Sequence, residues 1–247
     1  IPLRLVGSEM CIRDSPEVEQ ASVAIYNSVE RFPIRRIYCV GRNYRAHAIE
    51  MGADPDREDP FFFMKPADSI VENGATIPYP KMTSNFHHEI ELVAAIGTGG
   101  ININLNDALD HVWGYGVGID LTRRDLQNQA KKAGRPWDMG KGFDKSAPCT
   151  ALRSVDDVGH PDTGTGAIWI KVNGEIKQES TLDLHIWNTA ETINYLSGFC
   201  ELKPGDLIYM GTPDGVGPVV SGDTMKGHID GVGDIAVSYT HLRAHET

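Results

Sequence analysis

Two glutamates separated by one residue, Glu89 and Glu91, are the most informative residues of the sequence. The apolar residues around them predict a buried strand, in which alternate side chains share a face, so the two carboxylates point the same way. Acids placed together in this manner repel each other unless a cation or a proton intervenes. Carboxylate oxygens suit hard divalent ions, so the pair predicts a Mg²⁺ or Mn²⁺ site. A solvated strand face is the alternative for an isolated pair of this spacing.

His87 and Asp120 are the candidates for a further ligand. His87 falls on the face of the glutamates and would favour zinc, but no H-E-x-x-H motif or cysteine set accompanies it. Asp120 lies between a glycine-rich apolar strand and a predicted helix, where a strand end can deliver a carboxylate into a cleft. Its structural alternative is the N-cap of that helix.

Three further features could take part in chemistry. His47 and Glu50 lie three residues apart on a predicted helix, so the carboxylate can orient the imidazole to take a proton from water. The alternative is that both residues lie on the exposed surface and have no catalytic role. Lys141 lies between glycines, which allow close backbone approach, although a lone loop lysine is more often on the surface. Thr212 follows a strand in a Gly-Thr-Pro turn, whose amides could bind a carboxylate.

The elements that must position these groups are mostly strands. The expected strands are 34–40, 61–65, 89–96, 113–119, 167–172, 175–178 and 207–210, and the expected helices are 44–51, 121–133 and one that Asn188 caps and that ends at Leu196. Asn173-Gly174 predicts a tight hairpin turn. Alternate glycines in 113–119 indicate a strand pressed against other backbone. The pattern predicts one β-rich α+β domain.

The composition excludes several classes of protein. Of the 247 residues, 40% are hydrophobic and 23% are charged, which is typical of a globular protein and excludes a disordered, collagen-like or coiled-coil chain. The 23 basic residues against 34 acidic ones give a net charge of −11, the wrong sign for nucleic acid or an anionic membrane. The longest uncharged stretch, 92–106, is short and broken by Gly and Asn, so no transmembrane helix is expected.

The cysteines and the chain ends complete this picture. The four cysteines, Cys11, Cys39, Cys149 and Cys200, lie far apart, which favours a reducing, cytoplasmic setting. Residues 1–15 lack the pattern of a signal peptide. Residues 1–15 and 238–247 resemble translated sequencing adaptor, and we expect both to be non-native. We expect an N-terminal extension at 16–33 and a catalytic domain at 34–237.

A series of short motifs in the domain 34–237 resembles the fumarylacetoacetate hydrolase family. In order, they are Gly41-Arg-Asn-Tyr44 with His47 and Glu50, Phe63-Met-Lys-Pro66, His87-His-Glu-Ile-Glu91, Gly116-Val-Gly-Ile-Asp120, Arg124-Asp125, Met139-Gly-Lys-Gly142 and Gly211-Thr-Pro213. Within the family, residues 51–57 and 60–66 are most similar to bacterial members that hydrolyse fumarylpyruvate during aromatic degradation.

The resemblance implies a mixed β-sandwich roll, usually in a homodimer, and a role for each site residue. Glu89, Glu91 and Asp120 would hold Mg²⁺ or Mn²⁺, and His47 and Glu50 would activate water. Lys141 would contact the metal-bound substrate or stabilise developing negative charge. The residues implied to lie near the substrate's carboxylate or diketone oxygens are Lys65, Arg124, Gln127 and Thr212.

The implied reaction is hydrolysis of a carbon–carbon bond in a 2,4-dioxo acid, with fumarylpyruvate giving fumarate and pyruvate. A metal chelated by the 2-oxo acid would hold the departing enolate. The same metal and enolate would serve an oxaloacetate decarboxylase or an enolising isomerase, and a metal-stabilised binding protein would have no turnover. His47 and Glu50 favour hydrolysis. We also expect the helix 44–51 and the loop 53–60 to close over substrate as a lid.

Overall fold

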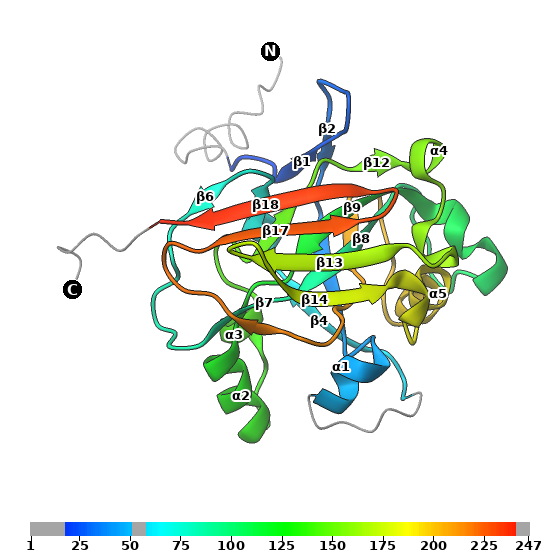
Figure 1. The fold of residues 1–247 in the computed structure, drawn as a ribbon. Helices are drawn as coiled ribbons and strands as arrows, with labels where there is room; N and C mark the ends of the chain where they lie inside the picture. Colours follow the sequence, from blue (N-terminus) through cyan, green and yellow to red (C-terminus); the bar gives the residue numbers. More distant parts are fainter. Residues whose placement is uncertain (1–17, 51–57, 241–247) are drawn as a thin grey trace, which may run out of the picture.

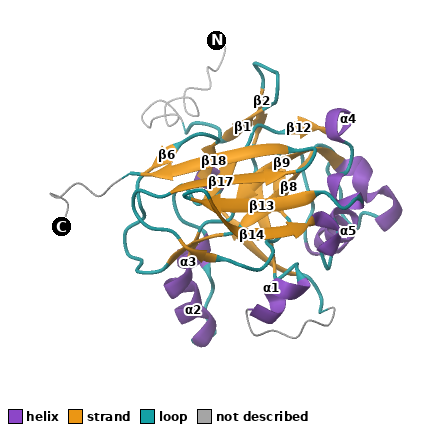
Figure 2. Ribbon diagram, viewed as in Figure 1, coloured by secondary structure: helices purple, strands orange, loops and turns teal. Residues whose placement is uncertain are grey.

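The computed structural model describes residues 18–50 and 58–240. The segment 1–15, Cys11, most of the predicted lid loop and residues 241–247 lie outside these ranges. Within them, none of the helices is long and apolar enough to cross a bilayer. Strands predominate over helices, so the β-rich prediction is confirmed (Figures 1 and 2).

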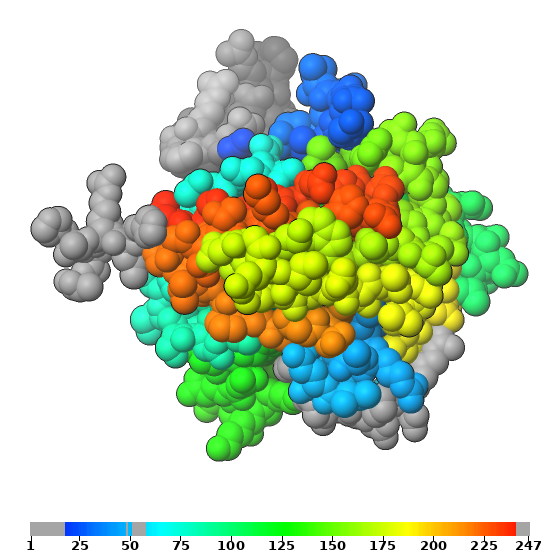
Figure 3. Space-filling model, viewed as in Figure 1, coloured from blue at the N-terminus to red at the C-terminus, as the bar shows by residue number. Residues whose placement is uncertain are grey.

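Two large sheets pack face to face (Figure 1). The first is mixed and contains, in spatial order, β4 (Phe61–Lys65), β3 (Arg36–Gly41), β15 (Asp206–Tyr209), β8 (Ile90–Ile96), β9 (Val112–Ile119), β11 (Ala147–Cys149) and β5 (Ile70–Glu72), with β12 (Arg153–Ser154) paired to β9. The second contains β14 (Glu175–Thr181), β13 (Ala167–Val172), β17 (Thr224–Ile229), β18 (Gly233–Tyr239) and β6 (Thr76–Ile77). Its β13, β14, β17 and β18 form the face turned toward the reader in Figure 3.

Smaller elements complete the fold. Short sheets are formed by β10 (Thr122–Arg123), β7 (Phe86–His88) and β16 (Gly217–Pro218), and by β1 (Ser22–Ala24) and β2 (Arg31–Pro33). The α-helices are α1 (Arg45–Glu50), α2 (Arg124–Lys132), α3 (Asp138–Lys141), α4 (Val155–Val158) and α5 (Thr189–Phe199), and the 3₁₀ turns are Ala67–Ser69, Leu105–His111, Pro161–Thr163 and Leu182–Leu184. α1, α2 and α3 lie at one end of the sheets (Figure 2).

Strand β8 is buried at every position because the first sheet has apolar cores on both faces. Leu92 and Ala94 belong to the core shared with the second sheet. Val93 and Ala95 belong to a separate core beneath β1 and β2. Since side chains alternate along a strand, Glu91 lies on the face of Val93, away from the second sheet.

Most of the predicted elements are present with shifted ends. β4 and β13 match their predicted ranges, and β3, β8, β9 and β15 differ by one or two residues. The hairpin at Asn173-Gly174 is confirmed, with positive φ at both residues. Asn188 and Glu191 form the predicted capping box of α5, which runs three residues beyond the predicted end. A Cβ at Gly114 would lie 2.1 Å from the Arg153 carbonyl oxygen, so β9 is pressed against backbone, as predicted.

The predicted start of one helix needs correction, and one strand extends past residue 237. The helix predicted at 121–133 begins only at Arg124, because Thr122 and Arg123 form β10 and pair with β7. Asp120 is therefore not its N-cap. At the C-terminal end, β18 continues through Ser238 and Tyr239, two residues past the expected limit of the domain. Tyr239 is buried against Phe86, with ring centroids 5.4 Å apart.

Candidate active site

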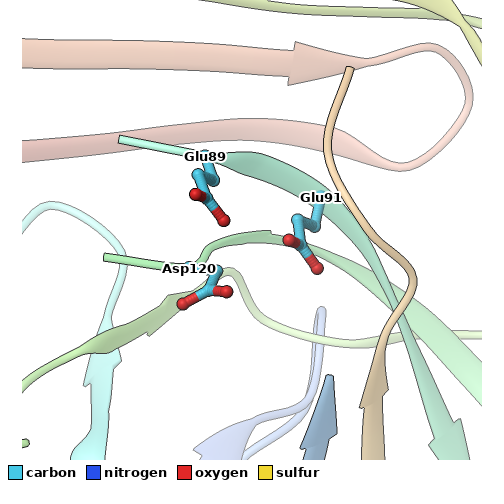
Figure 4. Close-up of side chains that lie close together, drawn as sticks. All are labelled: Glu89, Glu91 and Asp120. Carbon is cyan, nitrogen blue, oxygen red and sulfur yellow. The ribbon is translucent and has the colours of Figure 1, made fainter. Parts of the chain in front are cut away.

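Glu89, Glu91 and Asp120 form a buried cluster of carboxylates at the ends of β8 and β9 (Figure 4). The Asp120 amide donates to the Glu89 carbonyl oxygen at 2.8 Å, which places these two residues opposite each other. One oxygen from each of the three carboxylates lies within 4.8 Å of the others. Their exposed fractions are 4%, 2% and 0%, so the alternative of a solvated strand face is wrong.

Two of these carboxylates have buried cations as partners. Lys141 Nζ lies 2.7 Å from Glu89 Oε2 and 2.6 Å from Asp120 Oδ2. Arg124 forms an ion pair with Glu89 through the other carboxylate oxygen. Glu91 accepts a hydrogen bond from the Gly211 amide at 2.8 Å instead. Its negative charge is therefore the least compensated of the three.

The pKa values follow this distribution of charge. Burial opposes ionisation of Glu89, but the charges of Lys141 and Arg124 outweigh it and hold the pKa of Glu89 below its ordinary value. Burial, together with the charges of Asp120 and Glu89, raises the pKa of Glu91 well above its ordinary value. A divalent cation among the three carboxylates would relieve this repulsion. The all-oxygen donor set therefore fits Mg²⁺ or Mn²⁺.

Lys141 reaches the carboxylates because α3 packs tightly on α2. It is the last residue of α3 and is buried, so the alternative of a surface lysine in a loop is wrong. A Cβ at the preceding Gly140 would lie 2.9 Å from the Gln127 amide nitrogen. The glycine thus allows the two helices to approach closely enough to bring the ammonium group to Asp120.

Lys65 lies beside the carboxylate cluster but is not part of the cavity wall, and its implied place near the substrate stays a prediction. Its Nζ lies 2.8 Å from Asp120 Oδ1 and donates to the backbone carbonyls of Leu121, at 3.1 Å, and Lys141. The ammonium is buried and is not among the cavity-lining groups. Lys65 therefore holds Asp120 and the last residue of α3 in place from the side that faces away from the cavity.

His47 and Glu50 meet on α1, as their spacing predicts. His47 Nδ1 lies 3.1 Å from Glu50 Oε2. His47 is 5% exposed and lines the same cavity as the carboxylate cluster, so the alternative of an exposed surface histidine without function is wrong. A proton on Nδ1 donated to Glu50 leaves Nε2 free to accept a proton.

Asn43 fixes the start of α1 next to the carboxylates. Its Nδ2 donates to the Met210 carbonyl at 2.6 Å and to the Trp187 carbonyl at 2.8 Å, and its Oδ1 accepts from the Trp187 amide at 2.8 Å. The residue after Met210 is Gly211, whose amide binds Glu91. Consecutive peptide units therefore hold the helix of His47 and the cluster in register.

The remaining predicted residues, Arg124, Gln127 and Thr212, also line the cavity. Gln127 accepts a hydrogen bond from Arg124. Thr212 Oγ1 accepts a hydrogen bond from Gln178 Nε2 at 2.8 Å. Gln178 Oε1 in turn accepts one from the Ile90 amide at 3.1 Å. Gln178 lies on β14, so the second sheet helps to place Thr212 beside β8.

His87 does not join the cluster. Its Nε2 lies 2.8 Å from Asn85 Oδ1, and its Nδ1 faces Arg124 Nε at 3.4 Å. Burial and the charge of Arg124 lower the pKa of His87 to about 4.

The cavity is also lined by several residues that were not predicted as site residues: Val40, Gly41, Arg42, Phe63, Lys131 and Trp137. Of these, Gly41, Arg42 and Phe63 belong to motifs shared with the fumarylacetoacetate hydrolase family, which was the available signal.

Comparison with known proteins identifies the family. Residues 36–238 match the family described as fumarylacetoacetate (FAA) hydrolase C-terminal. The chain belongs to this family. A fumarylpyruvate hydrolase from a Ralstonia species is 44% identical over 190 residues, covering 76% of this chain and 97% of the relative. A mitochondrial oxaloacetate decarboxylase of Dictyostelium discoideum is 40% identical over 199 residues, covering 80% of this chain and 90% of that protein.

A solved structure of the family extends the comparison to the fold. Fumarylpyruvate hydrolase from Pseudomonas aeruginosa, in complex with Mn²⁺ and pyruvate, is 53% identical and superposes with a TM-score of 0.88. The match covers 92% of this chain and 98% of that one. The fold expected from the fumarylacetoacetate hydrolase resemblance is therefore confirmed.

Proposed function

We propose that this protein is a metal-dependent hydrolase of acylpyruvates, with fumarylpyruvate as its substrate and fumarate and pyruvate as products. The observation that carries the proposal is one cavity that holds a buried three-carboxylate cluster together with the His47–Glu50 pair. Relatives named as fumarylpyruvate hydrolases, one of them in complex with Mn²⁺ and pyruvate, support the choice of substrate and metal.

Glu89, Glu91 and Asp120 would hold Mg²⁺ or Mn²⁺. The bound ion would supply an electron sink for the 2-oxo acid as the carbon–carbon bond breaks. His47 Nε2 takes a proton from water, and Glu50 holds the imidazole in the required orientation and stabilises its positive charge. The water attacks the C4 carbonyl, and Lys141 offsets the negative charge that develops. The C3–C4 bond then breaks, and the proton held by His47 returns to C3.

Arg124, Gln127 and Thr212 have binding roles in this proposal. Arg124 contributes positive charge for a dianionic substrate, and the Gln127 amide and Thr212 hydroxyl offer hydrogen bonds at the cavity wall. Lys65 acts through Asp120, in place of the substrate contact that the family resemblance implied.

The test follows the ultraviolet enol absorbance of fumarylpyruvate and acetylpyruvate with Mg²⁺, Mn²⁺ or EDTA, while CO₂ release from oxaloacetate is measured in parallel. We expect metal-dependent cleavage to an acid and pyruvate. CO₂ release without diketone cleavage would instead support decarboxylation, the activity named for the Dictyostelium relative. Metal binding without turnover of any of these compounds would support a binding protein.

A histidine variant tests the assigned base. His47→Gln should lower kcat by about 10²- to 10⁴-fold, the usual contribution of a general base, and leave Mn²⁺ binding intact. His228→Gln is the matched control, because His228 lies on β17 and pairs with Asp230 and Asp234 away from the cavity. Full turnover by His47→Gln would remove this residue from the reaction.

We also propose that the protein is a homodimer in the cytoplasm. The family resemblance supports the dimer. Cys39, Cys149 and Cys200 are free thiols in the described part of the chain, which fits a reducing compartment. Light scattering on the purified protein tests the dimer, and a mass corresponding to 27.1 kDa would contradict it.

A further inference from the structure

The cavity extends beyond the groups that the reaction uses. Phe63 and Trp137 contribute aromatic rings to its wall, with centroids 5.8 Å apart, and Phe61 packs on Trp137 at 4.9 Å. Arg42 lines the same cavity. The wall therefore combines apolar ring surface with a guanidinium group, a pairing that suits a flat carbon chain ending in an anion.

Among the residues that the structure describes, Arg42 makes only weak contacts. Its Nη1 lies 3.9 Å from Glu58 Oε2, and the two side chains are 34% and 60% exposed. Its guanidinium carbon lies 6.0 Å from the centre of the Phe61 ring. Arg124 and Lys141, in contrast, already contact the carboxylates of the cluster. Arg42 is therefore a cavity cation that can bind an incoming anion without releasing a ligand of the metal cluster.

The backbone at Arg42 points to the same conclusion. Its φ is +57°, in the left-handed region that glycine and asparagine adopt readily and that arginine adopts at a cost. The turn joins β3 to α1, and the next residue is the anchored Asn43. Folding alone does not favour arginine here, and strained residues of this kind cluster at binding sites.

We propose that Arg42 binds the terminal carboxylate of the acyl group and thereby selects acylpyruvates whose acyl group is itself an acid. This inference rests on the proposed function and refines its substrate class. Fumarylpyruvate carries a carboxylate beyond its C4 carbonyl, whereas acetylpyruvate ends in a methyl group. A guanidinium can donate two parallel hydrogen bonds to a carboxylate. The rings of Phe63 and Trp137 border the unsaturated carbons between the two ends.

The test compares kcat/KM for fumarylpyruvate and acetylpyruvate in the Mn²⁺-loaded protein and its variants. Arg42→Asn removes the charge with a residue that tolerates the positive φ, so the turn is preserved. The ratio of the two kcat/KM values should fall by about 10- to 100-fold, the effect of losing a charged hydrogen-bonding partner, mainly through KM for fumarylpyruvate. Arg42→Lys should restore part of the ratio, because a point charge remains.

Arg135→Asn is the matched control, because it removes the same charge at an exposed residue outside the cavity. Its ratio should equal that of the wild type. Equal losses of both activities in Arg42→Asn would overturn the proposal, as would a wild-type protein that shows no preference for fumarylpyruvate. Failure of the wild type to cleave either diketone would instead refute the proposed function, so the two failures are distinguishable.

Discussion

Replacing Glu91 with glutamine should make the metal-free protein more stable. Glu91 is 2% exposed, and its pKa is raised well above the ordinary value of 4.5. A carboxyl group with a raised pKa binds more protons in the folded than in the unfolded state. The free energy of unfolding therefore falls as pH rises above 4.5. Glutamine keeps the volume and the acceptor for the Gly211 amide but has no such dependence.

The magnitude follows from the pH interval. Between pH 4.5 and 7 a fully protonated carboxyl costs about 1.4 kcal/mol per pH unit, so Glu91→Gln gains up to about 3 kcal/mol at pH 7. For a chain of this size the gain corresponds to a rise in Tm of up to about 6–12 °C. The gain should vanish near pH 4.5. With saturating Mn²⁺ the wild type should become more stable than the variant. The variant lacks one negatively charged ligand and should bind the ion more than about tenfold more weakly.

Thermal unfolding in EDTA at pH 4.5, 6 and 7, followed by Mn²⁺ titration calorimetry, measures both effects. Glu179→Gln is the control, because Glu179 is an exposed carboxylate on β14. A Glu91→Gln variant with a Tm equal to or below that of the wild type in EDTA at pH 7 would refute the reasoning. A stability gain that does not change with pH would refute it as well.

Three further predictions concern groups around the site. Asn43→Ala removes three hydrogen bonds, one buried and two partly buried, and should cost about 3 kcal/mol, measured by urea unfolding, whereas an unchanged midpoint would contradict its anchoring role. Lys65→Met leaves Asp120 short of a buried partner and should cost about 3–5 kcal/mol in EDTA, with part of the loss recovered in Mn²⁺; equal losses in both media would contradict this. Burial lowers the pKa of His185 to about 4, so the folded state binds fewer protons than the unfolded state between pH 4 and 6.5. The free energy of unfolding should therefore fall by about 2 kcal/mol from pH 7 to pH 5, and the same decline in His185→Leu would refute this cause.

The position of the carboxylate cluster could be predicted because it depends on local rules. Alternation along β8 places Glu89 and Glu91 on one face, and the end of β9 delivers Asp120 beside them. The hairpin at Asn173-Gly174 and the capping box at Asn188 are local in the same sense. In each of these cases the interacting groups are near in sequence or occupy adjacent strands.

The errors arose where a distant segment decides the outcome. The start of α2 depends on pairing between β10 and β7, some 35 residues away in the chain, so Asp120 resembled a helix cap when considered locally. The contacts of Lys65 depend in the same way on distant segments, because its ammonium group binds the carbonyls of Leu121 and Lys141 in other elements. Arg42 lies in a family motif, but its left-handed backbone at a non-glycine residue is not visible in the sequence pattern, so its place in the cavity wall was not predicted.

The pairing of Lys141 and Arg124 with the carboxylates also bears on how the protein acquires its metal. A structural zinc site supplies much of the folding energy of its domain, and chelation unfolds such proteins. Here two of the three acids already have internal counter-ions. The polypeptide can thus complete folding before it encounters an ion. Metal loading then becomes a late, reversible event governed by the ions that its surroundings supply, and one folded population can exchange Mg²⁺ for Mn²⁺ without unfolding.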